Sequence, residues 1–267
     1  MKVWAVANQK GGVAKTTTVV TLAGHLARQG LRCLLIDLDP HGSLTSYFKQ
    51  DPDELDKSAY NLFQMVHLSS NNEIKELILN SEVDGIDFIP ASISMATLDR
   101  QLGSQEGKGL VIKTVVELMS NDYDYVLIDC PPVLGVLMVN ALAACNHVIV
   151  PVQTEFLALK GLERMHHTLN MIVKARHHDV SFTIIPVMFD RRTRASIESL
   201  RALREKYSKE LWQSVIPVDT AFRMASQKGL PLSIMTPSSR GAKAYAELLE
   251  ELINPNKQPD LRLVNNE

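Results

Sequence analysis

The residues from Gln9 to Thr18, Q-K-G-G-V-A-K-T-T-T, bring two glycines, two lysines and several hydroxyl groups into one short stretch. Glycines allow backbone N–H groups to turn inward toward an anion, and a helix that begins there adds positive potential. Lys15 could then neutralise the β- and γ-phosphates of a nucleotide, and the Thr16 hydroxyl could hold Mg²⁺. The stretch predicts a phosphate-binding loop with contacts from Lys10, Gly11, Gly12, Val13, Ala14, Lys15, Thr16 and Thr17.

The loop differs from the strict P-loop pattern G-x-x-x-x-G-K-[ST]. That pattern needs glycine at two positions where this chain has Gln9 and Ala14, and the chain reads K-G-G-x-x-K-[ST] instead, with a second lysine, Lys10. Because alanine is strained at positive φ, we expect Ala14 to have negative φ. Clusters of glycine, lysine and threonine also occur in ordinary loops, so the nucleotide interpretation needs support from other residues.

Carboxylates at the ends of two apolar runs give that support. Asp37 and Asp39 are two residues apart in L-I-D-L-D-P-H-G-S, so an extended backbone points both to one face. Asp129 ends Y-V-L-I-D, where a buried strand delivers a carboxylate that holds Mg²⁺ opposite the Thr16 hydroxyl. Each aspartate alone also fits an ordinary strand end or turn, and the combination with the glycine loop favours a nucleotide site.

Apolar runs that predict strands alternate with amphipathic stretches that predict helices. The predicted strands are Val3–Ala7, Arg32–Asp37, Ile86–Ile89, Tyr125–Asp129, His147–Pro151, Ser181–Met188 and Gln213–Ile216. The predicted helices are Lys15–Gln29, Asn72–Leu79, Leu110–Ser120, Gly135–Ala144, Leu159–Ala175, Arg194–Tyr207 and Gly241–Asn254. This alternation predicts an α/β fold, a doubly wound and mostly parallel sheet with helices on both faces. Ligands of such sheets bind at the carboxyl ends of the strands, where the glycine loop and the aspartates fall.

Composition sets the outer limits of the interpretation. The chain has 267 residues with 45% hydrophobic and 22% charged residues and a net charge of -2, which is typical of a globular protein and does not indicate a general nucleic-acid binder. We expect a single domain over residues 1–254 and a polar, frayed tail over 255–267. The three cysteines lack metal-ligand spacing, so we expect reduced thiols and a cytoplasmic protein without a signal peptide.

Three motifs together resemble the ParA/MinD family of ATPases with a deviant Walker A loop, over about residues 1–254. They are K-G-G-x-x-K-[ST], the D-L-D-P-H-G segment (D-x-D-P-Q-G in the family) and D-C-P-P followed by G-V-L-M-V-N-A-L. The resemblance implies a P-loop ATPase that uses ATP and Mg²⁺. It implies that Asp39 orients the attacking water and that Asp37 supports the hydration shell of Mg²⁺. His41 stands where glutamine is usual in the family.

The same resemblance implies a homodimer that forms on ATP binding, in which Lys10 contacts the phosphates of the partner subunit. Hydrolysis then releases the dimer, and an activating partner protein, ParB-like or a chemotaxis-array adaptor, sets its timing. The family places its adenine contacts near the segment I-P-V-D, which implies roles for Pro217 and Asp219. The polar, proline-broken end of the sequence argues against membrane insertion of the MinD kind.

The cargo of such a switch has two interpretations. The runs F-D-R-R-T-R-A-S and I-P-V-D-T-A-F-R-M-A-S resemble the ParC branch, which places chemoreceptor arrays at the cell pole. The alternative is a partitioning ATPase on the nucleoid that binds nonspecific DNA through a segment of local charge +3 and one further arginine: Arg191, Arg192, Arg194 and Arg223. A balanced, solvated helix face explains that segment equally well. A third class, the ATP-dependent ligases of the dethiobiotin synthetase type, shares such loops.

Overall fold

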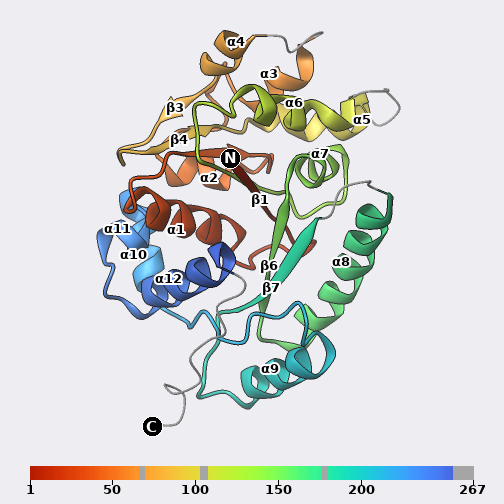
Figure 1. Cartoon of the computed structure of the whole chain (residues 1–267), viewed down its shortest axis with the longest axis vertical. Coiled ribbons are helices and arrows are strands. Elements are labelled where there is room, and N and C mark those ends of the chain that lie inside the picture. The colour runs from red at the N-terminus through yellow and green to blue at the C-terminus, as the bar shows by residue number, and fades with distance from the viewer. Residues whose placement is uncertain (66–69, 103–107, 176–179, 255–267) are drawn as a thin grey trace.

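The computed structural model describes residues 1–65, 70–102, 108–175 and 180–254, and it centres on one sheet (Figure 1). The strand order is β3-β4-β2-β5-β1-β6-β7, and every neighbouring pair is parallel except β3 and β4. This confirms the α/β prediction. The strands are β1 (Lys2–Val6), β2 (Cys33–Asp37), β3 (Leu79–Asn80), β4 (Ile86–Ile89), β5 (Tyr125–Asp129), β6 (His147–Gln153) and β7 (Ser181–Val187).

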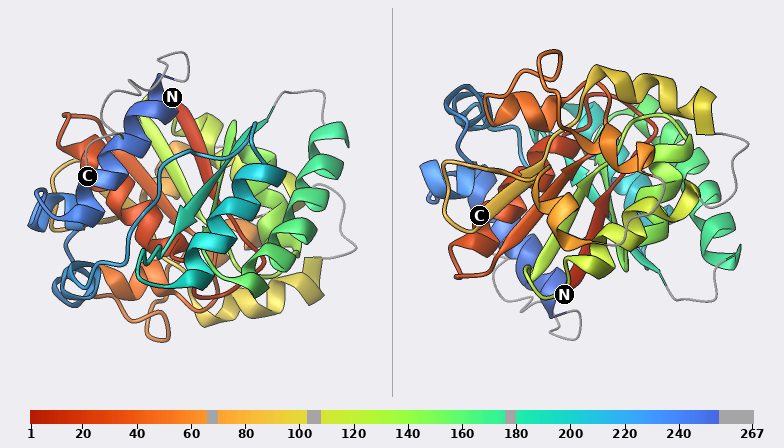
Figure 2. Two further views of the ribbon diagram at one scale, coloured as in Figure 1. Left: turned by 90° about the horizontal axis from the view of Figure 1, so that it is seen from below. Right: turned by 90° about the horizontal axis from the view of Figure 1, so that it is seen from above.

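Helices cover both faces of the sheet (Figure 2). They are α1 (Lys15–Ala27), α2 (Ser43–Tyr47), α3 (Ala59–Gln64), α4 (Asn71–Lys75), α5 (Leu98–Leu102), α6 (Val111–Leu118), α7 (Val136–Ala144), α8 (Phe156–Ala175), α9 (Arg194–Lys206), α10 (Ala221–Lys228), α11 (Leu232–Met235) and α12 (Arg240–Ile253). Helices α1 and α12 pack on one face, and α3, α5, α6, α7 and α8 on the other. Within the described ranges, no helix combines the length and apolar character needed to cross a membrane.

The apolar runs are continuous because both faces of the central strands are buried. In β1, Val3 and Ala5 belong to the core under α6 and α7, whereas Trp4 and Val6 belong to the core under α1 and α12. Successive side chains of a strand point to opposite faces, so a strand with two covered faces needs apolar residues at every position. Burial of this apolar surface stabilises the fold by removing it from water.

Strand register brings the predicted site residues together. Strand β5 lies between β1 and β2, and Asp129 at its end is the register partner of both Val6 and Asp37. The glycine loop leaves β1 directly after Val6, so the loop and both aspartates meet at the carboxyl edge of the sheet. Cys33, Cys130 and Cys145 are buried free thiols, as predicted.

Two predicted elements differ from the structure. Gln213–Ile216 is not a strand, because the isolated bridges of this region are made by the residues that flank it, Leu211 with Ile184 and Pro217 with Phe189. Ile216 donates to the Pro186 carbonyl at 2.8 Å, but Pro186 has no N–H to return, so a regular ladder cannot continue. The helix predicted over Asn72–Leu79 ends at Lys75, since Leu79 begins the edge strand β3.

Several short helices were not predicted, among them α2, α10 and α11. Each is shorter than the window of about 11 to 18 residues in which an apolar helical period is recognised. The predicted polar tail 255–267 lies outside the described residues.

Candidate nucleotide-binding site

The glycine loop connects β1 to α1 and is anchored at its start by Asn8. The Asn8 amide donates to the Pro151 carbonyl at 2.8 Å, and its oxygen accepts the backbone N–H of Lys10 at 3.0 Å. Above the loop the space is open, because a Cβ added at Gly11 or Gly12 would meet no atom within 4 Å. An open concave loop at a helix N-terminus has the shape and the potential to receive an anion.

Ala14 corrects one prediction. Its φ is 62°, in the left-handed region, rather than negative as expected. Ala14 is the N-cap of α1, and its carbonyl accepts both the N–H and the hydroxyl of Thr18, at 2.9 and 2.8 Å. The chain must reverse sharply between the loop and the helix, and the strict pattern uses glycine at this position. Alanine adopts the same conformation here at a cost of about 1 kcal/mol.

Lys15 and Thr16 open α1 at the centre of the site. Lys15 is only 7% exposed, and its ammonium group approaches the carbonyl of Lys10 at 3.4 Å. The Thr16 hydroxyl donates to Asp129 Oδ2 at 2.6 Å. The other oxygen of Asp129, Oδ1, is buried and has no hydrogen-bond partner among the described residues. Burial, and then the charge of Asp37, raise the pKa of Asp129 well above its usual value.

Asp37 is fully buried next to Asp129 and is held by Thr45 from α2. The Thr45 backbone N–H and hydroxyl donate to Asp37 Oδ2 at 2.9 and 2.7 Å, and Asp39 N donates to Oδ1 at 3.1 Å. Burial raises the pKa of Asp37 to about 7, and the Asp39 charge adds to the rise, while the Thr45 hydrogen bonds oppose it. Buried carboxylates that lie this close repel each other unless a cation is present.

The donor set fits Mg²⁺. Thr16 supplies a hydroxyl, Asp129 supplies a buried oxygen without a partner, and Asp37 supplies a second carboxylate beside it. Hard divalent cations take oxygen ligands of this kind, often through water. The sequence-predicted residues Thr16, Asp37 and Asp129 are therefore brought together as expected.

Asp39 lies at the rim of the site, with its side chain 12% exposed. Asp39 Oδ1 accepts the backbone N–H of His41 at 3.1 Å and pairs with His41 Nδ1 at 2.8 Å. Both residues line the same cavity as Lys15 and Thr16. A water molecule placed in that cavity could reach Asp39, which is the geometry that a water-orienting carboxylate requires.

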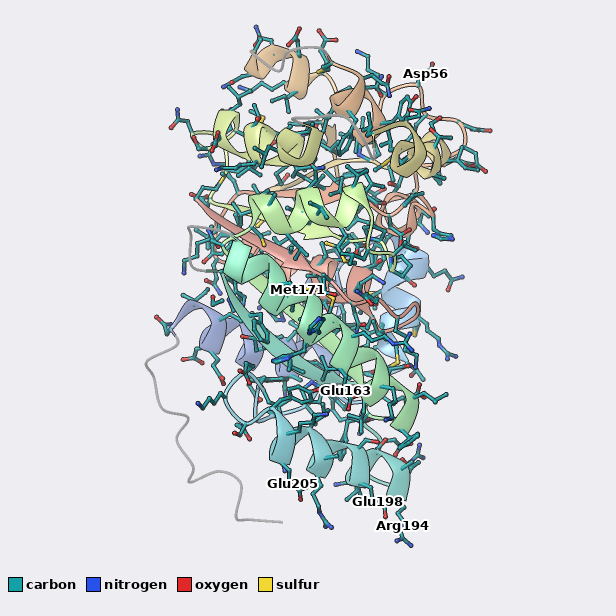
Figure 3. All side chains as sticks on the ribbon, turned by 90° about the vertical axis from the view of Figure 1, so that its right-hand side faces the viewer. Asp56, Glu163, Met171, Arg194, Glu198 and Glu205 are labelled. Atoms are coloured by element: carbon teal, nitrogen blue, oxygen red, sulfur yellow. The ribbon has the colours of Figure 1, made fainter. Side chains whose placement is uncertain are left out.

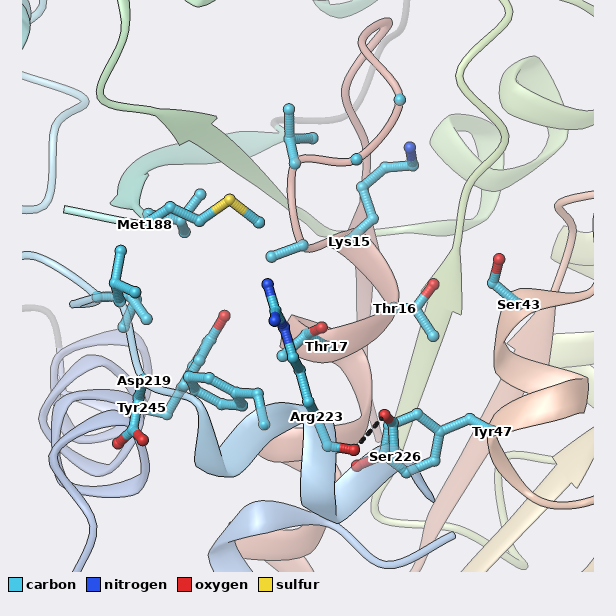
Figure 4. A pocket seen from close by; sticks show the side chains of 18 of the residues that line it. Lys15, Thr16, Thr17, Ser43, Tyr47, Met188, Asp219, Arg223, Ser226 and Tyr245 are labelled. Atoms are coloured by element: carbon cyan, nitrogen blue, oxygen red, sulfur yellow. Dashed lines mark hydrogen bonds between the residues drawn. The ribbon is translucent and has the colours of Figure 1, made fainter. Parts of the chain in front are cut away.

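The cavity has a volume of about 840 Å³ and extends from the glycine loop to α10. Figure 4 shows Lys15, Thr16 and Ser43 at its phosphate side and Met188, Arg223, Ser226 and Tyr47 around the remainder. The wall away from the loop contains the apolar residues Met188, Ile216, Pro217, Val218 and Phe222. A flat, largely apolar wall beside a phosphate loop suits a nucleotide base.

Pro217 and Asp219, the two residues predicted to contact adenine, both line the cavity, and the carboxylate of Asp219 is hydrogen-bonded within the protein. Its two carboxylate oxygens accept the backbone N–H groups of Ala221 at 2.9 Å and Gly241 at 3.0 Å. Asp219 therefore ties the loop before α10 to the start of α12. Figure 4 shows its carboxylate turned away from Lys15.

Lys10 is bound within its own subunit. Its ammonium group donates to Gln153 Oε1 at 3.0 Å and forms an ion pair with Glu155. The side chain is thus neither a free loop lysine nor, in this conformation, extended away from the molecule.

The arginines predicted to bind DNA do not form one patch. Arg192 is bidentate to Asp190, with N–O distances of 2.9 and 2.7 Å, and Arg194 pairs with Glu198. Figure 3 shows Arg194, Glu198 and Glu205 along the exposed side of α9. Arg223 lies elsewhere: its side chain rises from α10 into the nucleotide cavity (Figure 4). The pairing of Arg192 and Arg194 with carboxylates favours the solvated-face interpretation of that segment.

The fold and the loop together define the class of P-loop nucleotide-binding proteins. The AAA domain family model matches residues 1–182. The chain is 34% identical to the sporulation initiation inhibitor protein Soj of Bacillus subtilis, covering 94% of this chain and 98% of Soj. It is 32% identical to the chromosome partitioning protein ParA of Caulobacter vibrioides, covering 95% and 94%. The chain belongs to the ParA/MinD family of P-loop ATPases.

Solved structures agree with this assignment. Cobyrinic acid a,c-diamide synthase from Mycobacterium smegmatis, with a bound ATP analogue and magnesium, superimposes with a TM-score of 0.81 at 33% identity, covering 95% of this chain and 94% of that one. Apo McdA from Cyanothece shares the fold, with a TM-score of 0.82 at 21% identity and coverage of 95% and 99%.

Some residues of the site carried no signal in the sequence. Thr45 sits in a helix of five residues, and Tyr47 and Arg223 lie in short helices that no periodicity predicts. Met188, at φ 54°, lines the cavity from the end of β7. The sequence alone does not show that such a side chain lines the site, because its position depends on the conformation of a short turn.

Proposed function

We propose that this protein hydrolyses ATP with Mg²⁺ and acts as a nucleotide-controlled switch. The observation that carries the proposal is the juxtaposition of Lys15, the Thr16–Asp129 pair and Asp39 around one cavity. These groups match what phosphoryl transfer to water requires, namely a cation on the phosphates, a metal site and a carboxylate for water.

Each side chain has a distinct task in this proposal. The glycine loop and Lys15 bind the phosphates, and Thr16, Asp129 and Asp37 hold Mg²⁺, which neutralises the charge that develops on the phosphate oxygens. Asp39 accepts a hydrogen bond from the attacking water and orients it. Positioning and electrostatic stabilisation account for nearly all of the catalysis in such reactions.

The proposal includes an ATP-dependent homodimer. Large apolar side chains are exposed around the carboxyl edge of β5 and β6: Val133, Leu134, Val139, Phe156 and Leu157. Phe156 and Leu157 are about 70% exposed and follow Glu155, the partner of Lys10. If a second copy of the chain covered this apolar surface, its Lys10 would come close to the phosphates of the ATP bound to the first copy. Exposed apolar groups gathered beside a site are typical of an interaction surface.

The switch has one proposed cargo, the chemotaxis arrays at the cell pole, which rests on the ParC-like segments of the sequence. Its activator would be an array adaptor in the cytoplasm. The alternative is partitioning of chromosomes or plasmids, since Soj and ParA relatives cover nearly the whole chain. Pairing of Arg192 and Arg194 with carboxylates weakens a DNA surface. A fluorescent fusion separates the two: polar foci fit the first cargo, and signal over the nucleoid fits the second.

A ligase is the second candidate function, favoured by the likeness to cobyrinic acid a,c-diamide synthase. An ATP-dependent ligase would couple ATP consumption to an organic acid. If ATP turnover required such an acid and the protein remained monomeric, the ligase would replace the switch.

The decisive experiment combines turnover with size. Wild type, Asp39→Ala and Lys10→Ala are each measured for ATP affinity, phosphate release and mass by light scattering, with ATP and Mg²⁺. We expect Asp39→Ala to bind ATP, to lose turnover and to accumulate as a dimer. Lys10→Ala should bind ATP but remain monomeric. A dimer of Lys10→Ala would refute the proposed role of Lys10, and normal turnover of Asp39→Ala would refute the proposed chemistry.

A further inference from the structure

His41 is the one residue of the D-L-D-P-H-G segment that departs from the family pattern, and its imidazole lies against Asp39. We propose that His41 is a positioning residue that fixes the Asp39 carboxylate for hydrolysis. The inference rests on the proposed ATPase function and assigns a task to a side chain that the family pattern leaves unexplained.

The geometry directs both hydrogen bonds of His41 to one oxygen. Asp39 Oδ1 lies 2.8 Å from His41 Nδ1 and 3.1 Å from the backbone N of His41. An ionised carboxylate only accepts hydrogen bonds, so Nδ1 carries a proton and donates. With Oδ1 held twice, the carboxylate cannot rotate freely, and Oδ2 is left to accept a hydrogen bond from water.

The turn that carries His41 is held by the backbone. Gly42 has φ of 60° and donates its N–H to the Asp39 carbonyl at 2.8 Å. A Cβ at Gly42 would lie 2.6 Å from Cβ of Pro52, so only glycine fits there. The position of the imidazole over Asp39 is thus set by the turn itself.

A buried chain of hydrogen bonds supports the other side of Asp39. Its N–H donates to Asp37 Oδ1, Asp37 Oδ2 accepts from Thr45, and the Thr45 hydroxyl accepts from Ala91 N at 2.8 Å. Asp39 is therefore anchored to the sheet edge through its backbone and clamped at its carboxylate by His41. Precise placement of a group that touches the reacting water affects the rate more than the affinity for the nucleotide.

Histidine also differs from the family glutamine in stiffness. Its ring has two rotatable bonds where glutamine has three, so less conformational freedom is lost when the donor is fixed. The His41 side chain is 79% exposed, and the residue lines the cavity. In both histidine and asparagine the donor nitrogen is bonded to Cγ. Asparagine can therefore place its amide nitrogen where Nδ1 lies and serves as a conservative replacement.

The test compares His41→Ala and His41→Asn with wild type, using ATP and Mg²⁺. We expect His41→Ala to lower the rate of a single turnover at saturating ATP by about tenfold, the loss typical of a hydrogen bond to a charged group. ATP affinity and melting temperature should stay near wild-type values. His41→Asn should recover most of the rate, because it restores the donor.

The matched control is His167→Ala, which removes an exposed histidine on α8 that does not line the cavity and should leave the single-turnover rate and ATP affinity unchanged. The inference is overturned if His41→Ala turns over ATP at the wild-type rate, if its loss appears in affinity instead, or if His41→Asn is as slow as His41→Ala. Failure of wild type to bind or hydrolyse ATP would instead overturn the proposed function, so the two failures are distinguishable.

Discussion

The two ends of the nucleotide cavity are built in different ways. At the phosphate end, Lys15, Asp37 and Asp129 are each less than a tenth exposed, and short hydrogen bonds from the Thr45 and Thr16 hydroxyls hold the two carboxylates. At the base end, Arg223 and Met188 are exposed and reach the cavity from the short helix α10 and the strand end of β7. Charged groups need fixed partners when buried, whereas a base needs only a shaped apolar surface.

The difference explains where substitutions should matter. Removing a group from the phosphate end leaves a buried charge or donor without a partner, which is costly. Removing a group from the base end leaves space that water can enter, and this water can replace the lost contact with the nucleotide. We therefore expect a gradient of effects across the cavity, and each prediction below measures one step of it.

Lys15→Ala should have the largest effect. Loss of the buried ammonium group should weaken ATP binding by about 100-fold, because hydrogen bonds between charged groups contribute about 3 kcal/mol. Isothermal titration calorimetry with ATP and Mg²⁺ measures the change. Lys209→Ala, at an exposed position far from the cavity, is the control. If Lys15→Ala bound ATP within threefold of the wild-type affinity, the phosphate end would not be the part of the cavity where substitutions matter most.

Thr45→Val should have the largest effect on stability. The substitution keeps the shape but leaves Asp37 without one donor and Ala91 N–H without its acceptor, both buried. The free energy of unfolding should fall by about 2 kcal/mol. Urea titration measures it, and Thr45→Ser, which keeps the hydroxyl, should lose less. Equal stability of Thr45→Val and wild type would show that the phosphate end is not rigidly supported.

Arg223→Ala tests the base end. The guanidinium group projects into the cavity from α10 (Figure 4), where it can contact the nucleotide. We expect ATP affinity to fall by about tenfold, since the contact is made at an exposed position. Arg191→Ala is the matched control, being an exposed arginine outside the cavity. A loss as large as that of Lys15→Ala would remove the proposed gradient.

Asp219→Asn should have the smallest effect. The amide keeps one acceptor oxygen for the N–H groups of Ala221 and Gly241 and loses the other. The free energy of unfolding should fall by about 1 kcal/mol, while the affinity for ATP stays unchanged. Thermal unfolding with and without ATP reports both quantities. A strong loss of affinity would show that Asp219 contacts the base directly.

The contrast between the two ends of the cavity also explains which parts of the fold and of the candidate site could be predicted from the sequence. Strands β1, β2 and β5 and helix α1 were predicted within a few residues, because burial on both faces and a full helical period leave strong patterns. The candidate site residues could be predicted too, since Lys15 and Thr16 begin α1 directly after the glycine loop, and Asp37 and Asp129 end strands whose meeting point is set by topology.

The base end could not be predicted in this way. Arg223 was interpreted as a DNA contact, because a sequence gives charge but not the direction in which α10 presents it. The partner of Lys10 could not be predicted, because Glu155 lies 145 residues further along the chain, directly after β6 and Thr154. Ala14 was misjudged because the preference of an isolated alanine was weighed without the sharp reversal between the loop and α1, which overrides it.

The left-handed Ala14 has a consequence for the thermodynamics of loading. Glycine at this point would sample many backbone states in the empty protein, and each would have to be given up when the triphosphate arrives. The methyl group of Ala14 restricts the backbone conformations of the loop before ATP binds. The conformational entropy is therefore lost when the protein folds rather than when it binds the nucleotide. The loop should therefore bind with a smaller unfavourable entropy than its glycine variant, even where the enthalpies are alike.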